Sequence, residues 1–80
     1  MGKTITMIPV EQTRQTVSLT PREEEILVLV ARGLTSERIA QRLGLGYPTV
    51  RTHMEHIRGK LGVKTRAQAV ARAMAIGLIE

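Results

Sequence analysis

The sequence has none of several residue types on which common protein classes depend. It contains no cysteine, which excludes a disulfide framework and thiol chemistry and is typical of a protein kept in a reducing compartment. It contains no aspartate and no clustered pair of groups suited to acid–base catalysis, so no residue pattern supports an enzyme. With no phenylalanine and no tryptophan, any core must be built from aliphatic side chains.

Long apolar stretches are also missing. No run approaches the roughly 20 apolar residues that a membrane-spanning helix requires, and the first residues lack the apolar segment of a secretory signal. We therefore expect a cytoplasmic protein with no membrane partner. A chain of 80 residues is long enough for one small domain. Its margin of stability is thin because such a chain buries only about two thirds of its surface.

Positive charge is present in excess and is unevenly distributed. The formal net charge is +5. Residues 1–37 hold four basic side chains against five glutamates, whereas residues 38–79 hold eight basic side chains against Glu55 alone. A basic surface on one half of a small domain favours a polyanionic partner such as nucleic acid. The alternative is a basic domain whose charge serves only solubility.

Four helices are predicted from signals at their ends. Residues 20–23 combine a capping box with a proline at the first helical position, and Gly33 stops the first helix. A second, short helix follows Thr35 and ends at Gly44.

The third and fourth helices have signals of the same kind. The third is predicted over residues 48–61, because Tyr47 precedes a proline and is therefore disfavoured in helical backbone. The fourth is predicted over residues 65–76, where Thr65 and Gln68 have the spacing of a second capping box.

The predicted fold is all-α: a compact four-helix domain with a central helix-turn-helix. The second helix, a tight turn around Gly44 and Gly46, and the third helix form this motif. The domain covers residues 19–80. Residues 1–18 show no helical period and are predicted to be a flexible tail or linker. A short strand against a further domain is the alternative for that segment.

The third helix has two different faces when it is projected at 100° per residue. Its inner stripe is apolar and comprises Val50, Met54, Ile57 and Leu61. Its outer arc comprises Arg51, Thr52, Glu55 and His56, with Arg58 and Lys60 on the flanks. Arg51 can bond guanine, Thr52 can contact thymine, and Glu55 can accept from cytosine, so the outer arc favours base readout in a major groove. The alternative is a solvated face on which Arg51 and Glu55 form an ion pair.

The fourth helix is apolar on two sides, although a surface helix needs only one buried stripe. The second stripe comprises Ala67, Ala71, Met74 and Ala75. We expect this stripe to pair with its copy in a twofold dimer; the alternative is that alanine is simply a good helix former. His53 and His56 have no third ligand nearby, so we expect neither a metal site nor a cofactor.

Several motifs together resemble the LuxR/GerE-type DNA-binding domain. They include LTPRE at residues 19–23, VARGLT at 30–35, TVRTH at 49–53 and KLGV at 60–63, with shorter matches at 26–27, 39–40, 65–66 and 69–70. The resemblance covers residues 18–79 and implies a four-helix fold that binds duplex DNA in bacterial transcriptional regulation, usually as a dimer on two half-sites. It also implies that such a domain is usually the output module of a response regulator or quorum-sensing regulator, with a stand-alone member of the family as the alternative, and that RNA polymerase is a further partner.

The resemblance assigns roles to parts of the chain. It implies that residues 48–61 form the DNA-contacting helix and that residues 65–76 form the dimer helix. Base and phosphate contacts carry over to Arg51 and Thr52, and phosphate contacts carry over to Thr49, Arg58 and Lys60.

Three positions depart from the family pattern. Gly-Tyr-Pro at residues 46–48 replaces a Ser-then-polar start, which weakens the helix cap there and leaves the Tyr47 hydroxyl to replace a phosphate contact. Glu55 stands where many members have a basic or neutral polar residue, and Gly59 replaces a long side chain. The competing function is a protein-interaction module that docks an acidic partner, or a related promoter-reading module like that of a sigma factor.

Overall fold

Four α-helices make up residues 17–80, which are the residues that the computed structural model describes. They are α2 (Pro21–Ala31), α3 (Ser36–Leu43), α4 (Tyr47–Leu61) and α5 (Arg66–Ala75), and no strand lies between or beside them in this part of the chain. The prediction of an all-α, four-helix domain is therefore confirmed. Most of the predicted tail, residues 1–16, lies outside the described residues, and Val17 is half-buried against the core.

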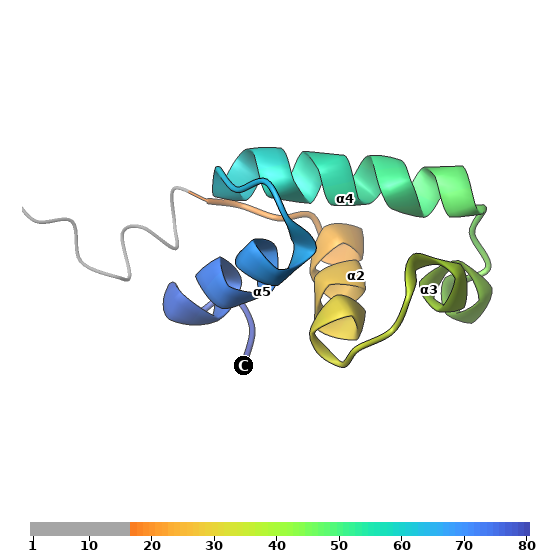
Figure 1. Cartoon of the computed structure of the whole chain (residues 1–80), viewed down its shortest axis with the longest axis horizontal. Coiled ribbons are helices and arrows are strands. Elements are labelled where there is room, and N and C mark those ends of the chain that lie inside the picture. The colour runs from red at the N-terminus through yellow and green to blue at the C-terminus, as the bar shows by residue number, and fades with distance from the viewer. Residues whose placement is uncertain (1–16) are drawn as a thin grey trace, which may run out of the picture.

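The helices are arranged with α4 along one side and the other three beneath it (Figure 1). Helix α4 is the longest and contacts α2, α3 and α5, while α2 also contacts α3 and α5. The tight turn from α3 to α4 lies at one end of the molecule, and α5 lies towards the other end (Figure 1). Because all its partners lie on one side, α4 keeps its opposite side exposed along its whole length.

The core is aliphatic, as the composition predicts. Its largest fully buried side chains are Ile26, Leu27, Ile39, Val50 and Ile57. The predicted inner stripe of α4 is buried at all four positions, which confirms the two-faced interpretation of that helix. Full burial of an aliphatic side chain stabilises a fold by about 1.5–3 kcal/mol, so this stripe fixes which side of α4 faces outward.

Local signals set most helix ends. The Thr20 hydroxyl accepts from the Glu23 N–H at 3.1 Å while Glu23 accepts from the Thr20 N–H at 2.9 Å, and Thr65 and Gln68 form the same reciprocal cap. Gly44 closes α3 with φ of +69°, a left-handed conformation that favours glycine because it has no Cβ.

Three predicted helix limits, on two helices, need correction. Helix α4 begins at Tyr47, one residue before the predicted start, with Gly46 as its cap. Pro48 is tolerated as the second residue because its missing N–H falls in the first turn, where N–H groups have no partner within the helix. Helix α5 covers Arg66–Ala75, so its predicted end residues at 65 and 76 are caps.

Arg66 joins the start of α5 to the loop between α2 and α3. Its guanidinium donates to the Leu34 carbonyl at 2.7 Å and to the Ser36 hydroxyl at 3.1 Å. Hydrogen bonds from a charged donor are stronger than neutral ones, so this contact helps to hold α5 and α3 in a fixed relation beneath α4.

Candidate nucleic-acid interface

All of the predicted DNA-contacting residues belong to α4. Seven of them are exposed: Tyr47, Thr49, Arg51, Thr52, Glu55, His56 and Lys60. Arg58 is half-buried. A single straight helix, packed on three others through its apolar stripe, therefore displays the whole set to solvent.

Arg51 lies over the ring of Tyr47, with its guanidinium carbon 5.9 Å from the ring centroid. Within residues 17–80 neither Arg51 nor Glu55 takes part in an ion pair, so the pair that the solvated-face alternative predicts is not formed there. An arginine above an aromatic face is held by a cation–π attraction of about 0.5–1 kcal/mol when exposed. Tyr47 thus biases Arg51 towards the start of α4.

Thr52 uses its hydroxyl hydrogen inside the helix. The hydroxyl donates to the Pro48 carbonyl at 3.1 Å. The oxygen can still accept a hydrogen bond and the methyl group is still exposed, so Thr52 can meet a base donor or a thymine methyl, but its own donor is occupied.

The start of α4 has no side-chain cap. Gly46 makes no side-chain hydrogen bond to the helix, and its carbonyl instead accepts from the N–H groups of Thr49 at 3.1 Å and Val50 at 3.2 Å. The weak cap predicted from the Gly-Tyr-Pro sequence is confirmed. Tyr47 is 42% exposed, so its hydroxyl group is a polar group available at the start of α4.

Lys60 has a partner that the sequence analysis missed. Its ammonium group lies 2.6 Å from a carboxylate oxygen of Glu23, whose side chain is only 5% exposed. Burial alone raises the pKa of Glu23, but hydrogen bonds from Lys60 and Thr20 and the Lys60 charge outweigh it and hold the pKa below its ordinary value. Lys60 therefore joins the end of α4 to the start of α2, and a phosphate contact must compete with Glu23.

A signal for this pair was present in the sequence. Glu23 lies at the edge of the inner face of its helix, where an acid requires a partner, and Lys60 lies on the flank of another helix. Only the three-dimensional packing of α2 on α4 shows that the two side chains meet.

The second apolar stripe of α5 is exposed. Its members are Ala67, Ala71, Met74 and Ala75, and Met74 retains 50% of its accessible surface. Three of them line a shallow, largely apolar hollow together with the end of α2: Ala67, Ala71 and Met74. The opposite stripe of the same helix, with Ala69 and Ala73, is buried in the core.

Comparison with known proteins places this geometry in a family. Residues 17–73 match the model of the bacterial regulatory proteins of the luxR family. The chain belongs to the luxR family. The predicted resemblance is thereby confirmed, and the helix-turn-helix of this luxR-family chain is that of a transcriptional regulator, which implies DNA binding.

Named relatives agree with this placement. The luxR-family chain is 45% identical over 56 residues to the probable HTH-type transcriptional regulator GfsR of Streptomyces halstedii, covering 70% of this chain and 23% of the relative. It is 43% identical over 56 residues to the nitrate/nitrite response regulator NarL of Escherichia coli strain K12, covering 70% and 26%. The chain thus spans about a quarter of the length of these relatives.

A solved structure supports the fold. The structure of the transcription factor GerE superposes with a TM-score of 0.74 at 35% identity, covering 78% of this chain and 92% of that one. Among residues 17–80, no helix has both the length and the apolar content needed to cross a membrane.

Proposed function

We propose that this domain binds duplex DNA sequence-specifically, with α4 in the major groove. The observation that carries the proposal is the outer side of α4, where Arg51, Thr52, Glu55 and His56 are exposed together on a helix held by its apolar stripe. A helix of this diameter fits a B-DNA major groove, and these side-chain types suit the polar edges of bases.

Each outer side chain has a role that its chemistry supports. The planar guanidinium of Arg51 suits bidentate bonding to guanine, and the methyl group of Thr52 suits contact with thymine. Glu55 suits acceptance from the cytosine amino group, because its charge repels phosphate and no cation within residues 17–80 neutralises it. His56 lies beside it on the same exposed arc.

The side chains at the ends and flanks of α4 are expected to make the phosphate contacts. Tyr47 and Thr49 lie at the start of α4, and Arg58 lies near its end. Lys60 adds a contact only if a phosphate draws it away from Glu23. Phosphate contacts fix the register of the helix on DNA and contribute most of the salt-dependent affinity.

We further propose that two copies bind paired half-sites through the exposed stripe of α5. Support comes from the exposed, apolar side chains of Ala67, Ala71, Met74 and Ala75. Exposed apolar side chains that lie on one side of a helix are typical of a protein–protein contact. The stripe consists of these four residues, three of them alanines, so we expect a monomer in dilute solution that dimerises on DNA, where one bound copy raises the effective concentration of the next. A tight free dimer in sedimentation would contradict this.

The cellular setting is an extension of the same proposal. A regulator that acts on promoter DNA works in the cytoplasm and meets RNA polymerase there. The competing function, docking of an acidic protein without DNA binding, predicts tight protein binding and no measurable affinity for any duplex.

In-vitro selection of bound duplexes from a random library tests the proposal. We expect recovery of a common motif, arranged as paired half-sites about one helical turn apart, with affinity that falls steeply as salt rises. Recovery of unrelated duplexes, or affinity independent of salt, would refute sequence-specific DNA binding by this domain.

A further inference from the structure

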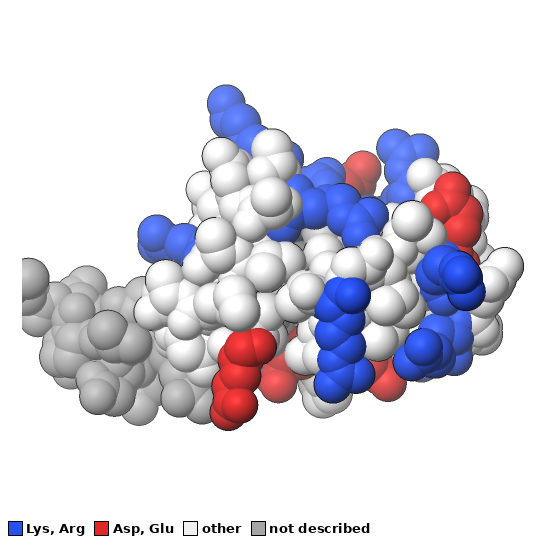
Figure 2. All heavy atoms as spheres, turned by 60° about the horizontal axis from the view of Figure 1, so that its bottom comes forward, with Lys and Arg blue, Asp and Glu red and all other residues white. Residues whose placement is uncertain are grey.

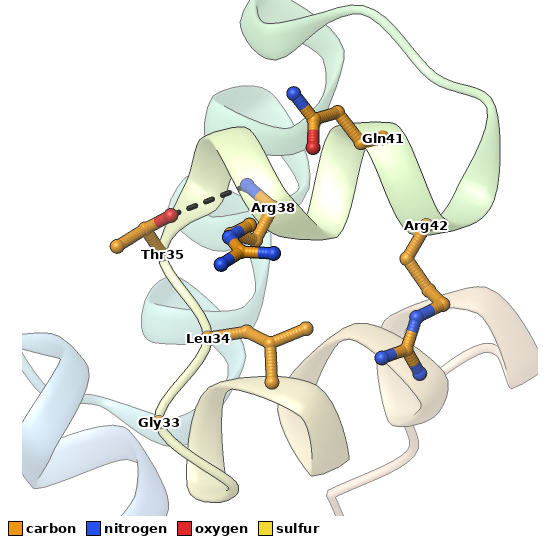
Figure 3. A pocket seen from close by; sticks show the side chains of 6 residues that line it. All are labelled: Gly33, Leu34, Thr35, Arg38, Gln41 and Arg42. Carbon is orange, nitrogen blue, oxygen red and sulfur yellow. Dashed lines mark hydrogen bonds between the residues drawn. The ribbon is translucent and has the colours of Figure 1, made fainter.

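A hollow lies on α3 and on the loop that leads into it. Its lining is Gly33, Leu34, Thr35, Arg38, Gln41 and Arg42. Figure 3 shows Arg38, Gln41 and Arg42 projecting from α3, and Leu34 extending from the loop towards the space between the Arg38 and Arg42 side chains. Leu34 is half-buried, whereas both arginines are exposed.

Neither arginine of this hollow forms an ion pair within the described residues. Within residues 17–80 no carboxylate lies within ion-pair distance of Arg38 or Arg42, although the same criterion finds Arg22 paired with Glu25. Glu37 precedes Arg38 in the sequence of α3. A second groove, which Arg42 also lines, contains Glu24 and Glu25 of α2. Arg32 lines that groove as well.

The hollow lies away from the proposed DNA-reading side. The loop from α2 to α3 runs along the side of the molecule opposite α4 (Figure 1). When that side is turned towards the viewer, Lys and Arg side chains are closely spaced towards the end that carries α3 (Figure 2). Because this surface lies on the side opposite α4, we expect DNA on the outer side of α4 to leave it uncovered.

Thr35 does not contribute an anion site of its own. Its hydroxyl caps α3 by accepting from the Arg38 N–H at 3.2 Å, the bond drawn in Figure 3. The available anion-binding groups are therefore the guanidinium forks of Arg38 and Arg42.

We propose that this hollow docks an acidic segment of a partner protein while α4 is on DNA. Carboxylates of the segment bond the forks of Arg38 and Arg42, and an aliphatic side chain between them covers Leu34. The half-buried leucine between two arginines without ion pairs favours a protein segment over a nucleic acid, because a sugar–phosphate backbone offers only sugar CH groups and no flexible alkyl side chain to cover it. Simultaneous binding rests on the proposed DNA function, whereas docking itself does not.

The test uses the full chain and a short labelled peptide of alternating glutamate and leucine. Binding is measured with and without a saturating duplex from the selection experiment. We expect binding in both conditions and a loss of about tenfold for R38A or R42A, with a larger loss for the double variant. Arg72→Ala, which removes one exposed positive charge from α5, serves as the matched control and should bind the peptide as the wild type does.

Three outcomes would overturn the docking proposal. Equal binding by R38A/R42A and the wild type would show that the hollow is not the site. Displacement of the peptide by duplex DNA would place the peptide on α4. A fall in duplex affinity of R38A/R42A as large as that of Arg51→Ala would make the hollow a DNA surface. Failure to bind any duplex, with peptide binding intact, would instead refute the proposed function alone.

Discussion

At the scale of single residues, the outer side of α4 depends on how its side chains are held before any ligand arrives. Arg51 lies over the ring of Tyr47 and is not paired with Glu55, and Thr52 donates to the helix backbone. A side chain held near its bound geometry loses less entropy on binding. Tyr47, the one aromatic residue of the chain, is thus placed to orient the arginine that we expect to read guanine.

Replacement of Tyr47 separates its two possible contributions. Tyr47→Leu should reduce discrimination at the base pair read by Arg51 by about 0.5–1 kcal/mol, because the cation–π contact is lost. Tyr47→Phe keeps the ring and should keep that discrimination, while losing affinity equally for all duplexes if the hydroxyl bonds phosphate. Affinities for duplexes that differ at single base pairs provide the measurement. Loss of discrimination in Tyr47→Phe would contradict the orienting role of the ring.

The Glu23–Lys60 pair predicts a dependence of stability on pH. Because the folded-state pKa of Glu23 is lowered, its stabilising effect is fully present above the unfolded-state pKa of about 4.3 and is lost as pH falls through the folded-state value. Glu23→Gln should therefore show a smaller loss of unfolding free energy between neutral and acidic pH than the wild type. Denaturant unfolding at both pH values measures this, with the exposed Glu24→Gln as the control.

Removal of Lys60 is expected to affect folding as well as DNA binding. Lys60→Met leaves the buried Glu23 carboxylate with only its Thr20 partners, at a cost of roughly 1 kcal/mol at neutral pH, since Lys60 itself is partly solvated. An unchanged unfolding free energy in Lys60→Met would show that the pair contributes nothing to stability.

At the scale of helices, the glycine that ends α3 and the glycine that caps the start of α4 differ in whether they can be replaced by another residue. Gly46→Ser should stabilise the domain by about 0.5 kcal/mol, because φ of −77° suits a side chain and an added Cβ meets only ordinary contacts with Pro48 and Thr49. Gly44→Ser, the matched control, should destabilise by roughly 1 kcal/mol because φ is +69° there. Thermal denaturation ranks the two variants, and a stabilised Gly44→Ser would contradict the argument.

The exposed stripe of α5 is expected to affect DNA binding only when two copies of the domain bind side by side. Ala71→Glu and Ala71→Lys both place a charge in the exposed stripe, so both should abolish cooperative binding to paired half-sites while single half-site affinity changes little. The use of both charges separates disruption of the interface from attraction to DNA. Persistence of cooperativity in both variants would remove α5 from the dimer contact.

At the scale of the whole molecule, features set by neighbouring residues could be predicted from the sequence, whereas contacts between distant residues could not. Caps at Thr20 and Thr65 and the inner stripe of α4 follow from neighbouring residues, so the number of helices and the outward face were predictable. The contacts of Lys60 with Glu23 and of Arg66 with Leu34 join residues more than 30 positions apart. Such contacts depend on how helices pack, and local patterns do not specify packing.

The candidate site divides in the same way. That Arg51, Thr52, Glu55 and His56 share one exposed side follows from helical periodicity alone. The position of Arg51 over the Tyr47 ring could not be predicted, because it depends on the side-chain rotamers of both residues. The hollow with Arg38 and Arg42 could not be predicted either, because it depends on the path of the loop between α2 and α3.

The central claim, that the outer side of α4 reads base sequence, is tested most directly by one comparison. The affinities of the wild type and Arg51→Ala are measured for the selected duplex and for duplexes changed at each base pair in turn. We predict that Arg51→Ala costs about 1–3 kcal/mol on the selected duplex and abolishes preference at one base pair only. An equal loss on every duplex, or no loss at all, would contradict base readout by α4.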